Sequence, residues 1–214
     1  MPNIGGRTAV RHDTAAVVLA GGLARRMGGG DKPLRELAGR PMLDHVLDAL
    51  RGQVGLIAIN ANGDPGRFAA WAMPVLPDTL PDHPGPLAGI LAGLEWAQAQ
   101  GVAWLVSAPG DSPLLPPDYV ARLHAAREAA GTPLACAISD GQTHPPCALW
   151  PTALRLDLEQ ALRGGERKID RWTARHGIAH AAWSTQPIDP FFNANAPEDL
   201  ALAEALLHKR ITRS

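Results

Sequence analysis

A glycine-rich segment with three basic side chains is the part of this sequence best suited to chemistry. It runs from Gly21 to Lys32, directly after a short apolar stretch at residues 15–20, and holds five glycines, two arginines and one lysine. Glycines allow backbone N–H groups to approach phosphate oxygens, and basic side chains neutralise the phosphate charge. The alternative is a surface loop whose charges are only solvated. The composition and position of the loop favour phosphate binding.

Two familiar nucleotide-binding motifs do not match this loop. Lys32 is followed by Pro33, whereas a P-loop has Ser or Thr after its lysine. The GxGxxG fingerprint of dinucleotide-binding folds is also absent, because Gly21 and Gly22 are followed by Leu23. The sequence therefore argues against both of these nucleotide-binding folds.

Asp111 is the best candidate for a metal ligand. It lies in Pro-Gly-Asp-Ser-Pro, directly after an apolar stretch at residues 103–108. Mg²⁺ prefers oxygen ligands and is usually bound through one or two carboxylates together with phosphate groups. The alternative is that the Asp111 side chain accepts a hydrogen bond from a backbone N–H in the next turn. The residues alone leave both interpretations open.

Other polar or glycine-rich segments follow predicted strands. Asp78 comes after a brief strand at residues 74–76, and the segment Gly85–Gly89 leads into a helix. Asn60 ends a further strand, although it also begins Asn-Ala-Asn-Gly-Asp, which is typical of a turn. Near the C-terminus two asparagines alternate, the second being Asn195, before a helix start with acidic residues in its first turn.

Apolar runs and helical patterns alternate along the chain and predict the elements that position these residues. Strands are expected at residues 15–20, 54–60, 74–76, 103–108, 133–138, 146–150 and 191–195, and helices at 41–50, 86–100, 117–130, 151–162 and 197–207. This alternation predicts an α/β fold with an open, mostly parallel, doubly wound (Rossmann-like) sheet flanked by helices. Ligands bind beyond the carboxyl ends of such strands, so the loops described above are expected to form one site.

Length and composition restrict the class of protein. The 214 residues suit a flexible leader at residues 1–14 and a single domain at 15–214, with a nucleotide-binding half at about 15–115 and an acceptor-binding half at about 116–214. A formal net charge of −1 argues against nucleic acid as a partner. The sequence contains no apolar run of about 20 residues, so no membrane span is expected. The two cysteines lie outside any CxxC pair, which favours the cytoplasm and argues against a zinc site.

Taken whole, Leu-Ala-Gly-Gly-Leu-Ala-Arg-Arg-Met-Gly-Gly-Gly-Asp-Lys resembles the signature loop of the molybdenum cofactor guanylyltransferase family, whose fold is of the nucleotide-diphospho-sugar transferase type. Gly-Pro-Leu-Ala-Gly and the C-terminal Asn-Ala-Asn-Ala-Pro-Glu-Asp-Leu also match that family, except that Ala196 replaces its usual threonine. The resemblance runs from Ala15 to about Leu206, with the motifs in family order.

The resemblance implies a role for each motif residue. The nucleotide would be bound by Leu19, Ala20, Gly21, Gly22, Lys32, Asn60, Asp78, Gly85 and Gly89. Arg26 and Lys32 would hold the triphosphate and, with Asp111, would be the catalytic residues. Asp111 and Asn195 would bind Mg²⁺ from opposite sides.

The implied reaction transfers GMP from GTP to the terminal phosphate of a molybdenum–pterin cofactor and releases pyrophosphate. Because a phosphate monoester is mostly ionised at neutral pH, the acceptor needs no dedicated general base. The acceptor would contact residues 140–147 and 164–168, although the second segment is equally consistent with a solvated loop. A protein that delivers or accepts the cofactor is also expected. The alternatives are a cytidylyltransferase for the same acceptor and a non-catalytic nucleotide- or cofactor-binding carrier.

Overall fold

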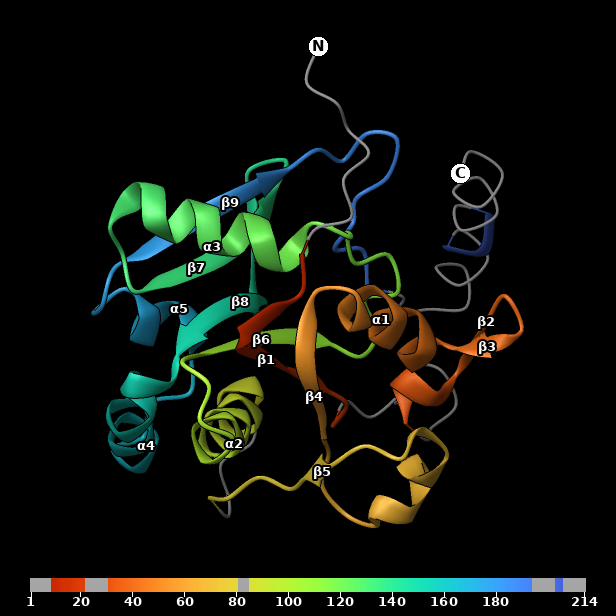
Figure 1. Cartoon of the computed structure of the whole chain (residues 1–214), viewed down its shortest axis with the longest axis horizontal. Coiled ribbons are helices and arrows are strands. Elements are labelled where there is room, and N and C mark those ends of the chain that lie inside the picture. Colours follow the sequence, from red (N-terminus) through yellow and green to blue (C-terminus); the bar gives the residue numbers. More distant parts are fainter. Residues whose placement is uncertain (1–8, 22–30, 81–84, 194–202, 206–214) are drawn as a thin grey trace.

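A seven-stranded sheet forms the centre of the computed structural model, which describes residues 9–21, 31–80, 85–193 and 203–205 (Figure 1). The strand order is β5-β4-β1-β6-β8-β7-β9. The strands are β1 (Arg11–Leu19), β4 (Val54–Asn60), β5 (Val75–Leu76), β6 (Trp104–Pro109), β7 (Leu134–Ser139), β8 (Gln142–Pro151) and β9 (Ile178–Trp183). Only β8 runs antiparallel to its neighbours in this sheet. The predicted mostly parallel α/β sheet is therefore confirmed.

Helices cover both faces of the sheet, as expected of a doubly wound fold. The α-helices are α1 (Met42–Arg51), α2 (Pro86–Ala99), α3 (Tyr119–Ala130), α4 (Arg155–Arg163) and α5 (Ile169–Thr173). Short 3₁₀ helices are η2 (Lys32–Leu34), η3 (Pro65–Trp71) and η4 (Thr152–Leu154), and β2 (Glu36–Leu37) pairs with β3 (Arg40–Pro41) in a separate ribbon.

The central strand β1 is buried on both faces and separates two apolar cores. Its side chains alternate: Ala16 and Val18 belong to the core under α1 and α3, while Ala15 and Val17 belong to the core under α2, α4 and α5. Strands buried on both faces are typically continuous apolar runs, which explains why this stretch could be recognised from its sequence.

Three parts of the sheet differ from the prediction. β1 begins at Arg11, so residues 11–14 belong to the strand and not to a flexible leader; the Arg11 N–H donates to the Gln53 carbonyl at 2.9 Å. The strand expected at residues 191–195 is not found among its described residues, 191–193. There the Phe191 N–H donates to the Asp189 carboxylate at 3.0 Å, so this backbone forms a turn. The edge strand β9 was not predicted.

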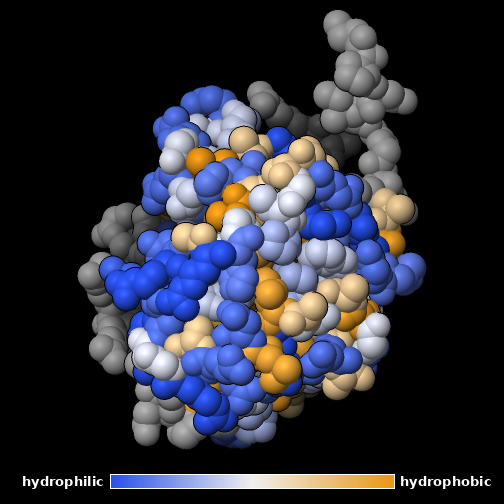
Figure 2. All heavy atoms as spheres, turned by 90° about the vertical axis from the view of Figure 1, so that its left-hand side faces the viewer, coloured by the Kyte–Doolittle hydropathy of each residue, from blue (hydrophilic) through white to orange (hydrophobic). Residues whose placement is uncertain are grey.

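The flank of the molecule that carries β9 is hydrophilic over most of its surface, with apolar side chains in small separate patches (Figure 2). The described residues of β9 alternate between buried and exposed positions, which is the pattern of an edge strand covered on one face. In the described part of the chain, none of the helices combines the length and the apolar character that a membrane span requires.

Candidate functional site

The loops predicted to bind a ligand begin together at one edge of the sheet. The Ala20 N–H, just beyond β1, donates to the Asn60 carbonyl at 2.8 Å, and the Gly110 N–H, just beyond β6, donates to the Leu19 carbonyl at 3.0 Å. These bonds join the carboxyl ends of three adjacent parallel strands. In an open α/β sheet this edge is where ligands bind.

Lys32 and Asp111 form a direct ion pair at this edge. Lys32 is the first residue of η2, and its Nζ donates to Asp111 Oδ2. Their side chains are only 10% and 21% exposed. Pro33 packs against Gly110, where an added Cβ would lie 2.9 Å from the proline Cγ. Glycine at position 110 thus allows η2 to approach and brings the lysine to the carboxylate.

Two asparagines hold the Asp78 carboxylate beyond β5. Asn60 Nδ2 donates to Asp78 Oδ1 at 2.9 Å and to the Leu76 carbonyl at 3.0 Å. Asn62 Nδ2 donates to Asp78 Oδ2 at 2.8 Å, and Asn62 Oδ1 accepts the Asp78 backbone N–H at 2.8 Å. The structure therefore brings Asn60 and Asp78 together, as the edge rule predicts, and adds Asn62.

The two glycines inside α2 lack a side chain for different physical reasons. A Cβ at Gly89 would lie 2.1 Å from Asn60 Oδ1 and 3.0 Å from Leu19 Cδ2, so a side chain there would displace the asparagine. A Cβ at Gly93 would lie 2.9 Å from side-chain atoms of Leu105 and Val17, inside the apolar core. Gly89 belongs to the site and Gly93 to the packing of the helix on the sheet.

An arginine links the phosphate-binding segment to the loop after β4. Arg67 in η3 donates from Nη1 to the Asp31 carboxylate and from Nη2 to the Asn62 carbonyl. Its Nε donates to the Asp64 carbonyl at 2.9 Å. Because Asp31 directly precedes Lys32, these contacts fix the loop that carries Asn62 relative to the loop that carries the lysine.

Of the remaining predicted nucleotide-binding residues, those that the structure describes lie at the same edge of the sheet. Gly21 is exposed just beyond β1, and Gly85 precedes α2 with φ of +121°, a conformation that favours glycine. The predicted residues Gly22, Arg26 and Asn195 lie outside the described residues. Two residues before Asn195 in the sequence, Asn193 accepts a hydrogen bond at its Oδ1 from Ser112 Oγ at 2.7 Å, which places Asn193 beside the loop of Asp111.

A second polar cluster lies at the carboxyl end of β7, within and next to the predicted acceptor segment 140–147. Ser139 Oγ donates to Asp189 Oδ1 at 3.0 Å and lies 2.6 Å from His144 Nε2. Since the hydroxyl has a single proton, which it donates to Asp189, the imidazole Nε2–H donates to the serine. Burial lowers the pKa of His144, an effect that Asp189 opposes. The ring stacks on Phe191 with centroids 4.8 Å apart.

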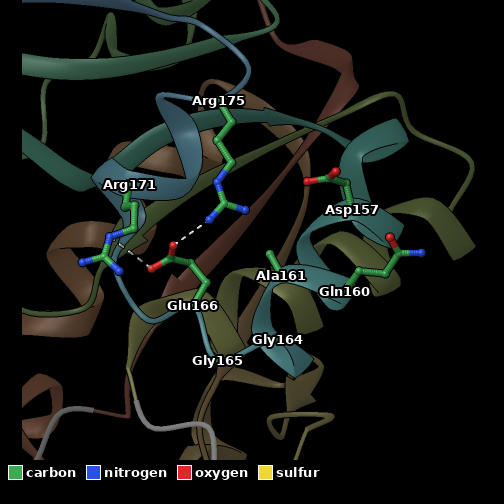
Figure 3. A pocket seen from close by; sticks show the side chains of 8 residues that line it. All are labelled: Asp157, Gln160, Ala161, Gly164, Gly165, Glu166, Arg171 and Arg175. Atoms are coloured by element: carbon green, nitrogen blue, oxygen red, sulfur yellow. Dashed lines mark hydrogen bonds and ion pairs between the residues drawn. The ribbon is translucent and has the colours of Figure 1, made fainter.

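The other predicted acceptor segment, residues 164–168, borders a hollow of about 490 Å³ between α4 and α5 (Figure 3). The Glu166 carboxylate accepts the N–H groups of Arg167 and Lys168 at 2.9 and 3.1 Å and pairs with Arg175 at 2.9 Å. A carboxylate from the chain itself thus accepts the backbone N–H groups just before α5 that an acceptor phosphate would otherwise bind. The hollow holds mutually paired charges and none of the motif residues.

Several residues of the site were not identified from the sequence. Asn62 and Asn193 each belong to an Asn-Ala-Asn segment in which only the other asparagine was selected, so the repeated pattern was an available signal. No local pattern marks Ser139 or Asp189. Ser139 lies 5 residues from His144 and 50 residues from Asp189 along the chain, so the three side chains meet only in the fold. In the described residues, no group of three or more His, Cys, Asp or Glu side chains is arranged to hold a metal ion.

Known proteins resemble this chain over most of its length. Residues 16–181 match the model of the MobA-like NTP transferase domain. The molybdenum cofactor guanylyltransferase of Rhodopseudomonas palustris (strain BisB5) is 55% identical over 90% of this chain and 93% of its own length. The enzyme of that name from Nitrobacter hamburgensis is 53% identical over 90% and 94%. The crystal structure of molybdopterin-guanine dinucleotide biosynthesis protein A from Archaeoglobus fulgidus superposes with a TM-score of 0.71 at 25% identity, over 92% of this chain and 99% of that one.

Proposed function

The chain belongs to the MobA-like NTP transferase family, and from this membership we propose that it transfers GMP from GTP to the terminal phosphate of a molybdenum–pterin cofactor, releasing pyrophosphate. The observation that carries the proposal is the identity of 55% and 53% to molybdenum cofactor guanylyltransferases over nine tenths of the chain. The Lys32–Asp111 pair at the carboxyl edge of the sheet supports it, because phosphoryl chemistry needs cations and oxygen ligands there.

We propose that Asp111 binds Mg²⁺ together with phosphate oxygens of GTP. One carboxylate at the end of a strand fits this ion, which is usually bound through one or two carboxylates, substrate phosphates and water and not by a cage of protein ligands. Asn195 is the second proposed ligand and follows closely after Asn193, whose side chain accepts a hydrogen bond from Ser112. When bound, Mg²⁺ would neutralise charge on the triphosphate and on the departing pyrophosphate.

Lys32 and Arg26 are proposed to bind the triphosphate. For Lys32 we propose an exchange of partner, because its ammonium group pairs with Asp111. A triphosphate carries several negative charges, and its oxygens compete for the ammonium group as stronger charge-assisted acceptors. Transfer of Lys32 to the phosphates leaves Asp111 available for the metal, so nucleotide and metal are expected to favour each other's binding.

The chemical step is an in-line displacement at the α-phosphorus of GTP. An oxygen of the acceptor phosphate forms the new bond to the α-phosphorus, and the bond to the bridging oxygen breaks, so that its electron pair leaves with pyrophosphate. The acceptor oxygen is already ionised at neutral pH because the second pKa of a phosphate monoester is about 6. The chain therefore contributes positioning and charge neutralisation and does not need to remove a proton.

The acceptor is proposed to lie against the cluster of Ser139, His144 and Asp189. This cluster lies at the end of β7 and at the start of β8, the strand between β6 and β7. It flanks the strand that leads into the loop of Asp111, because Ser107 of β6 pairs with Ala148 of β8 and its Oγ donates to the Pro146 carbonyl at 2.7 Å. Segment 140–147 is thus a better-supported acceptor element than segment 164–168.

We also propose that the protein is cytoplasmic and that a second protein delivers or accepts the cofactor. The location is supported by Cys136 and Cys147, which are both free and buried, as is usual in a reducing compartment.

The proposed function is tested by measuring pyrophosphate release from GTP and from CTP, with Mg²⁺, in the presence and absence of the molybdenum–pterin cofactor. Release that requires both GTP and the cofactor is expected. Release with CTP would transfer the protein to the cytidylyl alternative, and GTP binding without release would favour a nucleotide-binding carrier. Omission of Mg²⁺ is expected to abolish turnover; unchanged turnover without any divalent ion would remove the metal from the proposal.

A further inference from the structure

Asn62 makes a reciprocal two-point contact with Asp78. Its amide nitrogen donates to Asp78 Oδ2 at 2.8 Å, and its amide oxygen accepts the Asp78 backbone N–H at 2.8 Å. The contact joins the end of β4 to the end of β5, and Asn62 itself is exposed. An exposed asparagine that uses both ends of its amide on one residue fixes the orientation of that residue.

The two asparagines leave the Asp78 carboxylate with unused acceptor capacity on both oxygens. An ionised carboxylate accepts about four hydrogen bonds, two on each oxygen. Asn60 occupies one position on Oδ1 and Asn62 occupies one on Oδ2. The carboxylate plane is therefore held from both sides, and each oxygen can still accept one further donor.

Two adjacent donors are what the Watson–Crick edge of guanine provides, through its N1–H and its 2-amino group. Cytosine presents an amino donor next to a ring nitrogen acceptor, which a carboxylate would repel. A carboxylate that accepts only one of the two guanine donors would discriminate poorly, so recognition depends on how the plane of the carboxylate is oriented.

We propose that Asn62 is a positioning residue that sets the base selectivity of the nucleotide site by orienting Asp78 for two-point recognition of guanine. The inference rests on the proposed function, because it concerns the base of GTP. Asn62 acts through Asp78 and does not need to touch the nucleotide. Asn60 has a different role, because its side chain also donates a hydrogen bond to the Leu76 carbonyl and packs against Gly89.

Arg67 extends this arrangement to the phosphate-binding loop. It donates to the Asn62 carbonyl and pairs with Asp31, the residue before Lys32. The base-reading carboxylate and the phosphate-binding lysine are thereby connected through one chain of polar contacts. Selection of the base and placement of the triphosphate are expected to be coupled through it.

The test compares GTP with ITP, which lacks the 2-amino group, in the wild-type protein and in Asn62→Ala, Asp78→Ala and the double variant. In Asn62→Ala the ratio of kcat/KM for GTP to that for ITP is expected to fall about tenfold, the effect of one charge-assisted hydrogen bond. The fall should come from KM for GTP. The double variant should show no larger fall than Asp78→Ala, because the two residues act as one unit.

Asp64→Ala is the matched control. Asp64 lies in the same loop and accepts the Gly66 N–H at 2.8 Å, without a hydrogen bond to Asp78, so its loss loosens the loop but keeps the Asn62–Asp78 contact. It is expected to leave the GTP/ITP ratio unchanged. Asn62→Asp nearly keeps the side-chain shape while replacing the amide donor by a carboxylate, and provides a second variant if Asn62→Ala does not fold.

The outcomes separate this inference from the proposed function. If the wild-type protein releases no pyrophosphate from GTP and cofactor, the proposed function fails. If it does, and Asn62→Ala and Asn62→Asp lower kcat/KM equally for GTP and ITP, Asn62 is only structural and the inference is overturned. An equal fall of the ratio in Asp64→Ala would overturn it as well.

Discussion

The two ends of β1 and β6 carry polar clusters of opposite character. At the carboxyl end, Lys32 and Asp111 are full charges that pair with each other. At the amino end, Thr14 Oγ1 lies 2.9 Å from His124 Nε2, and the imidazole meets the Trp104 ring edge-on with centroids 5.5 Å apart. Both Thr14 and His124 are 1% exposed. The same two strands thus end in a charged site at one edge and in a buried cluster with a neutral imidazole at the other.

The two clusters differ in whether their side chains can exchange their present partners for a ligand. Thr14 donates to the Asp13 carboxylate at 3.0 Å, so its oxygen accepts the Nε2–H of His124, and burial lowers the pKa of that ring to about 4. Its Nδ1 has no hydrogen-bond partner in the described part of the chain, which suits an unprotonated nitrogen. The amino-end cluster therefore contributes to stability, while the charges at the carboxyl end are suited to exchanging partners with a ligand.

The largest expected effect is a loss of turnover when the carboxyl end of the sheet is changed at Asp111. Asp111→Ala removes the proposed metal ligand and is expected to lower kcat on the order of 10²–10³-fold, the size typical of a lost transition-state electrostatic contact. GTP affinity measured by calorimetry should change much less, because base contacts remain. Asp111→Asn is the matched isosteric variant. A turnover within twofold of the wild type in both variants would exclude Asp111 as a metal ligand.

A smaller loss is expected when the cation of the same pair is removed. Lys32→Met keeps much of the side-chain volume but cannot neutralise the triphosphate, so kcat/KM for GTP should fall about 10- to 100-fold. Lys32→Arg should recover part of the loss. Lys32→Met also frees Asp111. The protein without nucleotide should therefore bind Mn²⁺ more tightly, as measured by calorimetry. Unchanged Mn²⁺ affinity would contradict the proposed exchange of partners.

The two glycines of α2 test where the site ends and the core begins. Gly89→Ala forces Asn60 away from its position, and KM for GTP is expected to rise about tenfold, a loss of one charge-assisted contact. Gly93→Ala overpacks the core against Val17 and Leu105, which should lower the free energy of unfolding by about 1–3 kcal/mol. Urea unfolding and steady-state kinetics on both variants check this. A KM that rises equally in both would assign both glycines to packing.

The sequence predicted which loops lie together at one edge of the sheet better than it predicted the contacts between them. The continuous apolar run at residues 54–60 predicted β4 with the same bounds, whereas β9, with three alanines and a histidine in six residues, has weak strand propensity and was missed. The rule for strand ends brought the loops of Lys32 and Asp111 to one edge. Their pairing across 79 residues depends on the packing of Pro33 on Gly110, which no local pattern contains.

The smallest expected effect concerns the amino end and leaves catalysis unchanged. The folded-state pKa of His124, about 4, lies below its ordinary value of 6.5. The unfolded chain therefore binds the proton first, and stability is lost as the pH falls from 6.5 towards 4.

His124→Gln retains a donor for Thr14 but cannot titrate. From pH 7 to pH 4 the wild-type protein is therefore expected to lose about 3 kcal/mol more unfolding free energy than this variant. Urea unfolding at both pH values measures the difference. At pH 7, kcat and KM of the variant should match the wild type, because the imidazole lies at the edge of the sheet opposite the site. Parallel pH dependence of the two proteins would mean that the pKa of His124 is the same in the folded and the unfolded chain, and a changed KM would mean that the two ends of the sheet are coupled.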